Sequence, residues 1–300
     1  MKYQCAHRWA FSAWGGQLAE QEDALAPAVG HEVTVRVTHC GMCHSDLHLQ
    51  AGGFDMGGGK LSSFERAGIK LPVTMGHEIV GEVVEIGPEV TGIAVGTHVV
   101  VYPWLGCGEC ATCKRDQEHI CSKPRQLGIQ VAGGYSEYVL VPHPKYLLDA
   151  TGVPEGLAAT YMCSGITAFG AVKKAQGQDG GKPILVIGAG GVGLMGVRFA
   201  KSVLGHEPIV ADIDENKRKL ALENGAVAAF DPRDKDARKQ IFELTGGTGV
   251  GAAIDFVGAE SSAQFGLKAL GRGGRLIIVG LFGGTFSIPL PMFAFTGCQI

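Results

Sequence analysis

The sequence has few charged residues and no concentration of charge of one sign. Only 18% of its 300 residues are Asp, Glu, Lys or Arg, and the formal net charge is -3. No basic run provides the positive surface that nucleic acid or an anionic membrane would need. We therefore expect neither as a partner, and small molecules are the expected ligands.

Long apolar segments are also missing. The N-terminal residues MKYQCAHRWAFSAWGG lack the apolar core of a signal peptide. No segment reaches the run of roughly eighteen apolar residues that a membrane span needs. A hydrophobic content of 46% over 300 residues is enough for two cores. We expect a two-domain globular protein in the cytoplasm, without a membrane partner.

The cysteines do not form the even set that a disulfide framework requires. Their number is nine, which fits metal ligation plus reduced thiols better than complete pairing. Cys5, Cys40 and Cys298 stand alone in apolar surroundings and are expected to be small core residues.

Four cysteines cluster in the run CGECATCKRDQEHIC. Cys107, Cys110, Cys113 and Cys121 have the spacing C-x2-C-x2-C-x7-C, which can bring four thiolates to one tetrahedral zinc ion. The residues between them are too polar to bury a core, so a structural metal would supply the missing stability. Two disulfides or four unrelated thiols are the alternative, and nothing else in the sequence indicates an oxidising compartment.

The pattern of apolar residues changes in the middle of the chain. Up to about residue 147, short β-rich runs such as EVTVRV and SEYVLV alternate with glycine-rich turns, which predicts a small β-barrel. After Pro154, strands alternate with amphipathic helices, which predicts a parallel, doubly wound sheet with strands near Ile184, Ile209, Ala228, Ala253 and Leu276. The glycine-rich residues 52–71 are expected to form a flexible surface loop.

A glycine-rich turn between the first predicted strand and helix of the second half indicates a dinucleotide site. Gly188, Gly190, Gly191, Val192 and Gly193 follow the strand ILVI and open a helix, whose N-terminus would face a pyrophosphate. Asp212 ends the next strand, where a carboxylate accepts hydrogen bonds from the adenosine ribose and disfavours the 2′-phosphate of NADP. NAD is the expected cofactor. The alternative is that Asp212 only caps the following helix, and both roles are compatible.

Three further metal-ligand residues are scattered along the chain. Cys43 lies in CGMCHSDLH, His77 in MGHEIVGEV and Cys163 in MCSGITAFGA. Each one alone is more often a core residue or a hydrogen-bonded histidine. Together, two thiolates and one imidazole would form an open zinc site with a position free for substrate.

Several motifs in one order make the chain resemble the zinc-dependent alcohol dehydrogenases of the medium-chain dehydrogenase/reductase family. They are the C-H-S-D-L-H run at Cys43–His48, the G-H-E-x-x-G run at Gly76–Gly81, the four-cysteine lobe, the C-x-G-x-T-A run at Cys163–Ala168 and the nucleotide turn. The resemblance implies a GroES-like β-barrel catalytic domain over 1–152 with the lobe at 107–121, and a Rossmann domain over 153–300.

The resemblance also implies roles for individual residues. Cys43, His77 and Cys163 would hold the catalytic zinc, as in the set of two cysteines and one histidine that is standard for alcohol dehydrogenase. Glu78 matches a glutamate beside that zinc, and Ser45 and His48 match a proton relay that passes through the cofactor ribose. The remaining matches are His44 near the pyrophosphate and Trp104 in the wall of the substrate pocket. From their positions, Asp46 is expected to accept from the N–H of His77, and Lys217, five residues after Asp212, to touch the ribose.

Simpler interpretations of these last residues stay open. His44 can be a solvated loop residue, Asp46 a helix cap, Lys217 an exposed helix lysine and Trp104 a core residue. Proteins of the family continue for a few dozen residues past the position of Ile300, so we expect a Rossmann half that is truncated at its C-terminal end, with a sixth strand beginning near Cys298.

The expected activity is reversible hydride transfer between an alcohol and NAD, which gives an aldehyde or ketone. Zinc would be present at one catalytic and one structural site. The alternatives are an idle zinc- and nucleotide-binding protein, and a relative that acts on polyols or mainly reduces aldehydes. A homo-oligomer, dimer or tetramer, is expected where the C-terminal part is complete.

Overall fold

The computed structural model describes residues 5–177 and 181–300. They divide into two compact units, Met1–Gly53 with Ser62–Cys163, and Phe54–Leu61 with Ser164–Ile300. Each unit has hydrophobic clusters of its own, so we describe each separately. The domain limits of 1–152 and 153–300 that we expect from the sequence stay a prediction.

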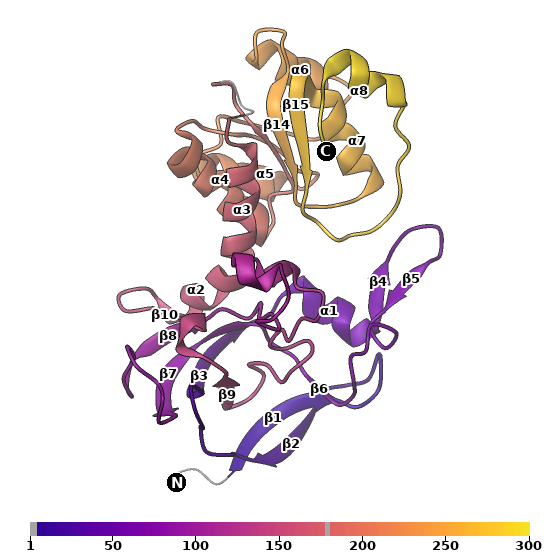
Figure 1. The fold of residues 1–300 in the computed structure, drawn as a ribbon. Coiled ribbons are helices and arrows are strands. Elements are labelled where there is room, and N and C mark those ends of the chain that lie inside the picture. Colours follow the sequence, from indigo (N-terminus) through magenta and orange to yellow (C-terminus); the bar gives the residue numbers. More distant parts are fainter. Residues whose placement is uncertain (1–4, 178–180) are drawn as a thin grey trace. The chain divides into compact units, whose positions relative to one another are not determined.

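Antiparallel sheets form the framework of the first unit. The main one has the order β10-β8-β7-β3-β9 (Figure 1). Its strands are β3 (Val33–Gly41), β7 (Glu78–Ile86), β8 (His98–Val101), β9 (Tyr138–Val141) and β10 (Leu147–Asp149). A three-stranded sheet of β1 (Cys5–Phe11), β2 (Ala19–Ala24) and β6 (Val73–Thr74) completes the framework.

The central strand β7 shows why this sheet is stable. Ile79 and Val83 alternate with Val80, so the first two side chains enter the main core of the unit and the third enters a second cluster on the other face. That second cluster includes Ala158 and Ala159 of α2 (Glu155–Thr160). A strand that is buried on both faces has a fixed register, because a slip of one residue would exchange its two faces.

The structure corrects two expectations about the N-terminal half of the chain. The glycine-rich residues 52–71 are not a loop throughout, because β4 (Gly53–Asp55) and β5 (Leu61–Ser63) pair as a two-stranded sheet and Ile69 is buried. Helix α1 (His44–Ala51) is implied only by the interpretation of Asp46 as a helix cap, since its eight residues include only two leucines. Cys5 is exposed, while Cys40 packs at the edge of the main core.

Parallel strands form the sheet of the second unit, in the order β13-β12-β11-β14-β15. They are β11 (Leu185–Ile187), β12 (Ile209–Ala211), β13 (Ala228–Phe230), β14 (Val250–Asp255) and β15 (Leu270–Ile278), which confirms the five predicted strands. No sixth strand forms within the described residues; near Cys298, Gln299 makes a single parallel bridge with Arg275. Cys298 itself packs against one of the cores.

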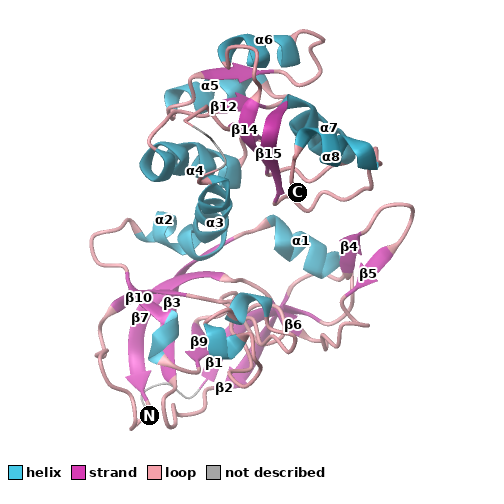
Figure 2. Ribbon diagram, turned by 45° about the horizontal axis from the view of Figure 1, so that its top comes forward, coloured by secondary structure: helices cyan, strands magenta, loops and turns pink. Residues whose placement is uncertain are grey.

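Helices lie on both sides of the parallel sheet (Figure 2). Two clusters of buried residues belong to this unit. The helices are α3 (Ile166–Ala175), α4 (Gly191–Phe199), α5 (Glu215–Glu223), α6 (Ala237–Leu244), α7 (Glu260–Ala269) and α8 (Leu290–Thr296). The three central strands β11, β12 and β14 are buried throughout, because helices cover both faces of the sheet. Among the described residues, no helix has both the length and the apolar character that crossing a membrane requires.

A buried carboxylate lies at the end of β14. Asp255 is fully buried, and its Oδ1 accepts hydrogen bonds from the backbone N–H groups of Val257 and Gly258, while its Oδ2 accepts one from the hydroxyl of Ser262. These three bonds fix the turn between β14 and α7. Burial nevertheless raises the pKa of Asp255, and the three donors only partly offset this effect.

Candidate metal centres and nucleotide site

Three elements of the first unit bring Cys43, His77 and Cys163 together. Cys43 is the N-cap of α1, His77 directly precedes β7, and Cys163 lies in η4 (Tyr161–Gly165), a turn of π-helix after α2. Their ligand atoms all lie within 4.8 Å of one another, and the two Sγ atoms are 3.8 Å apart. Sulfurs on a tetrahedral zinc ion would be about 3.8 Å apart, given Zn–S bonds of about 2.3 Å.

The protonation of this cluster also fits a cation. The Cys43 and Cys163 sulfurs share a hydrogen bond, and this contact lowers the pKa of Cys43 to about 4 and raises that of Cys163. Burial would lower the pKa of His77, but Asp46 and Cys43 outweigh it and raise the value to about 10. Both ring nitrogens of His77 are buried. Nδ1 lies 3.3 Å from Asp46, and Nε2 has no hydrogen bond of good geometry within the described residues, although Cys43 approaches the ring. A divalent ion can replace the shared proton and satisfy Nε2, so the donor set fits zinc.

Glu78 and Trp104 border the same cluster. Glu78 is 2% exposed, and Gly41 lies opposite it in the pairing of β3 with β7. A Cβ at Gly41 would overlap the Glu78 carboxylate, so glycine is needed there. Trp104 Nε1 donates to the carbonyl of Met162 at 2.9 Å, and its ring centroid lies 5.6 Å from that of His77. Trp104 therefore forms part of the wall beside the imidazole.

Helix α1 carries the remaining predicted residues of this region. Asp46 Oδ1 lies 3.3 Å from His77 Nδ1, and Oδ2 accepts from the backbone N–H of Cys43 at 2.9 Å. Asp46 thus meets both expectations, since it faces the imidazole and also stabilises the first turn of the helix.

The same helix carries His44, Ser45 and His48. His44 is exposed and Ser45 half-buried, and the His44 and His48 rings are 5.0 Å apart. Burial and the charge of His44 lower the pKa of His48.

The four-cysteine lobe has the geometry of a second tetrahedral centre. Its sulfurs all lie within 4.8 Å of one another, with distances of 3.4 Å from Cys110 to Cys113, 3.8 Å from Cys110 to Cys121 and 3.9 Å from Cys107 to Cys113. Backbone N–H groups point at the sulfurs, and those of Glu109 and Cys113 lower the pKa of Cys107 and Cys110 respectively. None of the nine cysteines forms a disulfide. These four fit a structural zinc ion.

The nucleotide turn of the second unit has a distinct role for each glycine. Gly188 has a φ of +86°, which L residues rarely adopt, and a Cβ at Gly193 would overlap the carbonyl of Gly188. Gly190 and Gly191 instead face open space, because a Cβ at either position would have no neighbour within 4 Å. The N-terminus of α4 begins there, with Gly190 as its N-cap. The loop therefore leaves room for a pyrophosphate at a helix N-terminus, which fits a dinucleotide.

Asp212 lies directly after β12 and is 7% exposed. Its two oxygens accept from the backbone N–H of Ala189, at 2.7 Å, and of Asp214, at 2.8 Å. The cap of helix α5 is Asp214, which accepts from Asn216 and Lys217. The alternative that Asp212 caps this helix is therefore wrong. Lys217 is exposed on α5.

Two supporting residues escaped the sequence analysis. Tyr135 donates its hydroxyl to Asp46 at 3.1 Å, from 89 positions further along the chain. Glu118 accepts from the N–H of Gly106, the hydroxyl of Tyr146 and the ammonium of Lys145, and so ties the lobe to the following segment. Neither partnership has a local signal, because the partners come from segments that are separate in sequence.

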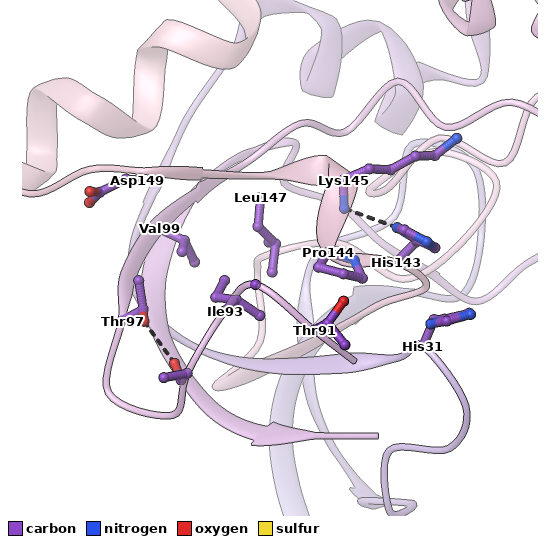
Figure 3. A pocket seen from close by; sticks show the side chains of 12 residues that line it. His31, Thr91, Ile93, Thr97, Val99, His143, Pro144, Lys145, Leu147 and Asp149 are labelled. Atoms are coloured by element: carbon purple, nitrogen blue, oxygen red, sulfur yellow. Dashed lines mark hydrogen bonds between the residues drawn. The ribbon is translucent and has the colours of Figure 1, made fainter. Parts of the chain in front are cut away.

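A groove of about 870 Å³ lies on the first unit, but none of the predicted site residues lines it (Figure 3). Ile93, Val99 and Leu147 point toward one another inside it, whereas Lys145 points away and is bound to Glu118. His31 at its edge is 3.3 Å from Glu89. The charged groups at this groove therefore have partners within the chain.

Comparison with known proteins assigns families to both parts of the chain. Residues 30–155 match the family described as Alcohol dehydrogenase GroES-like domain, and residues 191–300 match the family described as Zinc-binding dehydrogenase. The framework of the first unit is therefore GroES-like, and the second is of the Rossmann type, as the sequence predicts.

Individual relatives cover most of the chain. An NAD-dependent alcohol dehydrogenase of Saccharolobus solfataricus is 40% identical over 95% of this chain and 81% of its own length. An L-threonine 3-dehydrogenase of Pyrococcus abyssi is 34% identical over 92% of this chain and 75% of its length. The crystal structure of an alcohol dehydrogenase from Aeropyrum pernix has a TM-score of 0.85 and 31% identity, covering 98% of this chain and 83% of that one.

Proposed function

Because this chain belongs to the zinc-dependent alcohol dehydrogenases of the medium-chain dehydrogenase/reductase family, we propose that it oxidises an alcohol reversibly with NAD. The observation that carries the proposal is the convergence of Cys43, His77 and Cys163 within 4.8 Å of one another, with a second, four-cysteine centre in the same unit. An open set of two cysteines and one histidine is a catalytic arrangement, and a closed set of four cysteines is a structural one.

Cys43, His77 and Cys163 would hold the catalytic zinc, and Cys107, Cys110, Cys113 and Cys121 the structural one. The chemistry that zinc supplies when bound is Lewis acidity, which lowers the pKa of a coordinated alcohol. Glu78, buried beside Cys163, would place its carboxyl group next to the ligands. Trp104 would provide an apolar wall for the substrate.

A proton must leave the substrate before its carbon can give up a hydride. Ser45, two residues after Cys43 on α1, would accept this proton on its hydroxyl and donate its own onward. His48 is half-buried one turn later on the same helix and has a lowered pKa, so its neutral imidazole would accept the proton near neutral pH.

The chemistry that NAD supplies is acceptance of the hydride. Gly188, Gly190, Gly191, Val192 and Gly193 would bind its pyrophosphate, and the resemblance assigns the exposed His44 to the same group. Asp212 would accept from the ribose hydroxyls and repel a 2′-phosphate, with Lys217 nearby on α5.

We also propose that the protein works in the cytoplasm as a homo-oligomer. All nine cysteines are free thiols, which suits a reducing compartment. Several large apolar side chains of the second unit are exposed, among them Phe282 and Phe295, and a second copy would cover them. Light scattering would give the number of subunits.

The experiment that tests the function combines zinc analysis with NAD-linked turnover on primary alcohols, secondary alcohols, polyols and aldehydes. Cys43→Ala should abolish turnover and retain the lobe zinc, so the zinc content falls from about two ions per chain to about one. Cys5→Ala is the matched control, because Cys5 is exposed and lies outside both clusters. Normal turnover in Cys43→Ala would make the assignment of the catalytic centre wrong.

The same panel separates the alternatives. An idle binding protein would bind zinc and NAD and turn over none of the substrates. A polyol dehydrogenase or aldehyde reductase would prefer those substrates, and the relative named L-threonine 3-dehydrogenase indicates that the family accepts different alcohols.

A further inference from the structure

The carboxylate of Asp46 is fixed from two sides. Its Oδ2 accepts from the backbone N–H of Cys43 at 2.9 Å and from the hydroxyl of Tyr135 at 3.1 Å, while its Oδ1 lies 3.3 Å from Nδ1 of His77. The first donor belongs to the same helix end as Asp46. Of these two donors to Oδ2, Tyr135 is the one that comes from a distant segment, so its hydroxyl helps to set how the carboxylate is oriented relative to the imidazole.

The segment of Tyr135 is joined directly to the segment of His77. Gly133 N donates to Thr74 O at 2.9 Å, Gly134 N to Gly76 O at 2.8 Å and Tyr135 N to Met75 O at 3.0 Å. Three consecutive backbone bonds therefore hold residues 133–135 against residues 74–76. The position of the Tyr135 side chain is set by the same contacts that set the position of His77.

Close packing makes this join rigid. Gly76 has a φ of +93°, and a Cβ there would lie 2.6 Å from Cδ1 of Tyr135 and 2.7 Å from the sulfur of Cys40. The Tyr135 ring also packs against the cluster that contains Leu49 of α1 and Met75. The Tyr135 hydroxyl thus contacts Asp46 on α1, while the ring lies against Gly76, the residue before His77.

We propose that Tyr135 is a positioning residue for the Cys43–His77–Cys163 centre, acting through Asp46. Its hydroxyl holds the carboxylate so that Oδ1 faces Nδ1 of His77, which keeps the proton on Nδ1 and leaves Nε2 available as a metal ligand. This inference rests on the proposed function, because it concerns the zinc ion that the function requires. It assigns a role to a residue that lies outside every motif of the resemblance.

The substitution Tyr135→Phe removes the hydroxyl and keeps the ring, so the packing against Gly76 is preserved. We expect a chromogenic chelator to release the catalytic zinc about tenfold faster from Tyr135→Phe than from the unaltered holoenzyme, at the lower end of the effect of outer-sphere partners. The release phase of the catalytic zinc is identified as the one missing in Cys43→Ala. In the protein loaded with Co²⁺, the visible absorption bands of the catalytic site should shift as well.

Tyr146→Phe is the matched control. Tyr146 also donates its hydroxyl to a carboxylate, but that carboxylate is Glu118 beside the cysteine lobe. This variant should leave the release rate of the catalytic zinc unchanged. A general loosening of the first unit would accelerate the catalytic release in both variants and would contradict the proposal.

A double-variant cycle separates positioning from a local packing effect. In Asp46→Ala the hydroxyl has no carboxylate to hold, so adding Tyr135→Phe should not accelerate zinc release further. Additive effects, or a release rate in Tyr135→Phe equal to that of the unaltered protein, would overturn the inference and leave the proposed function intact. Absence of a catalytic release phase in the unaltered holoenzyme would instead remove the proposed function together with the inference.

Discussion

Two aspartates that are two positions apart after β12 have different tasks. Asp214 caps α5 by accepting from Asn216 and Lys217, whereas Asp212 is buried and bonds to the nucleotide turn at Ala189. Each carboxylate is therefore tied to one structure, the helix in one case and the glycine-rich turn in the other. A substitution at Asp214 can therefore serve as the control for the same substitution at Asp212.

We predict that Asp212→Asn raises KM for NAD about 10- to 100-fold, because charged hydrogen bonds are worth about 1.5–3 kcal/mol. The same change should reduce the preference for NAD over NADP, since the repulsion of the 2′-phosphate is lost. Initial rates with both cofactors measure the two effects. Asp214→Asn, which keeps a good capping residue, is the control, and an equal effect of both substitutions would contradict the role of Asp212.

Asp255 should make stability depend on pH in an unusual direction. Burial raises its pKa above the unfolded value of about 3.9, so the native state holds a proton that the unfolded state has already released. The stability that this proton provides is fully present below about pH 4 and is lost as the pH rises through the raised pKa. In Asp255→Asn this loss should disappear, as denaturation at several pH values would show.

Asp231 offers the opposite case as a control. Arg233 lowers the pKa of Asp231 to about 2, so its contribution is present above about pH 4 and is lost only as the pH falls below it. Asp231→Asn should therefore leave the pH dependence above pH 4 unchanged. If Asp255→Asn and Asp231→Asn changed this range alike, the assigned direction for Asp255 would be wrong.

For individual residues, the sequence predicts the site residues that belong to short local motifs. It does not reveal residues whose hydrogen-bond partners are distant in the sequence. Cys43, His77 and Cys163 were found through their short motifs, and the structure brings them together. Asp212 and Asp214 both precede the helix, so local signals could not separate their roles. Tyr135 had no signal, because its hydrogen bond to Asp46 depends on how two loops meet in the folded first unit.

Among the elements of the fold, the cysteine lobe is the one whose stability depends most on a bound metal ion. Its 3₁₀-helices η1 (Cys113–Arg115) and η2 (Glu118–Ile120) are three residues each, and Ile120 is exposed, so little apolar burial supports them. Glu118 adds polar contacts to Gly106, Lys145 and Tyr146. The lobe therefore should lose its structure when the metal is removed.

We predict that Cys107→Ala loses the lobe zinc and lowers the melting temperature by several degrees, at about 2–4 °C per kcal/mol lost in a chain of this size. Removal of zinc by a chelator should lower the melting temperature of the unaltered protein similarly. Scanning calorimetry with zinc analysis measures both. Cys298→Ala changes a cysteine outside the lobe and should retain both zinc ions; an equal zinc loss there would refute the assignment.

Elements with a strong period were predicted well, and short or irregular ones were not. The parallel strands near Ile184 and Ile209 are continuous apolar runs between turns and formed where expected. The β4–β5 hairpin was missed because Gly57, Gly58 and Gly59 suggest a loop, although here they form the turn between two three-residue strands with φ values of +61° to +80°. These residues form strands because they pair with each other, although their local sequence favours a loop.

For the whole molecule, the two units contain the proposed sites of different ligands. The candidate zinc ligands all belong to the first unit, while the nucleotide turn and Asp212 belong to the second. Each unit has its own buried clusters. Binding of each ligand should therefore stabilise mainly the unit that holds it.

Calorimetry can detect this division. We predict that NAD at about 100 times its Kd adds about 2.7 kcal/mol to the stability of the second unit and raises its melting transition. A chelator should lower only the transition of the first unit. A single transition that shifts as one under both treatments would show that the units unfold together and would contradict this expectation.

The position of Cys163 in the candidate metal centre depends on the number of residues in the π-helical turn at Tyr161–Gly165. Such a turn contains one residue more than a regular helical turn, and Cys163 lies within it. Loss of a single codon there would restore regular helix and swing the thiol by about 100° around the axis, out of reach of Cys43 and His77. A related protein could therefore lose the catalytic metal site through one in-frame deletion, while its strands and hydrophobic cores stayed the same.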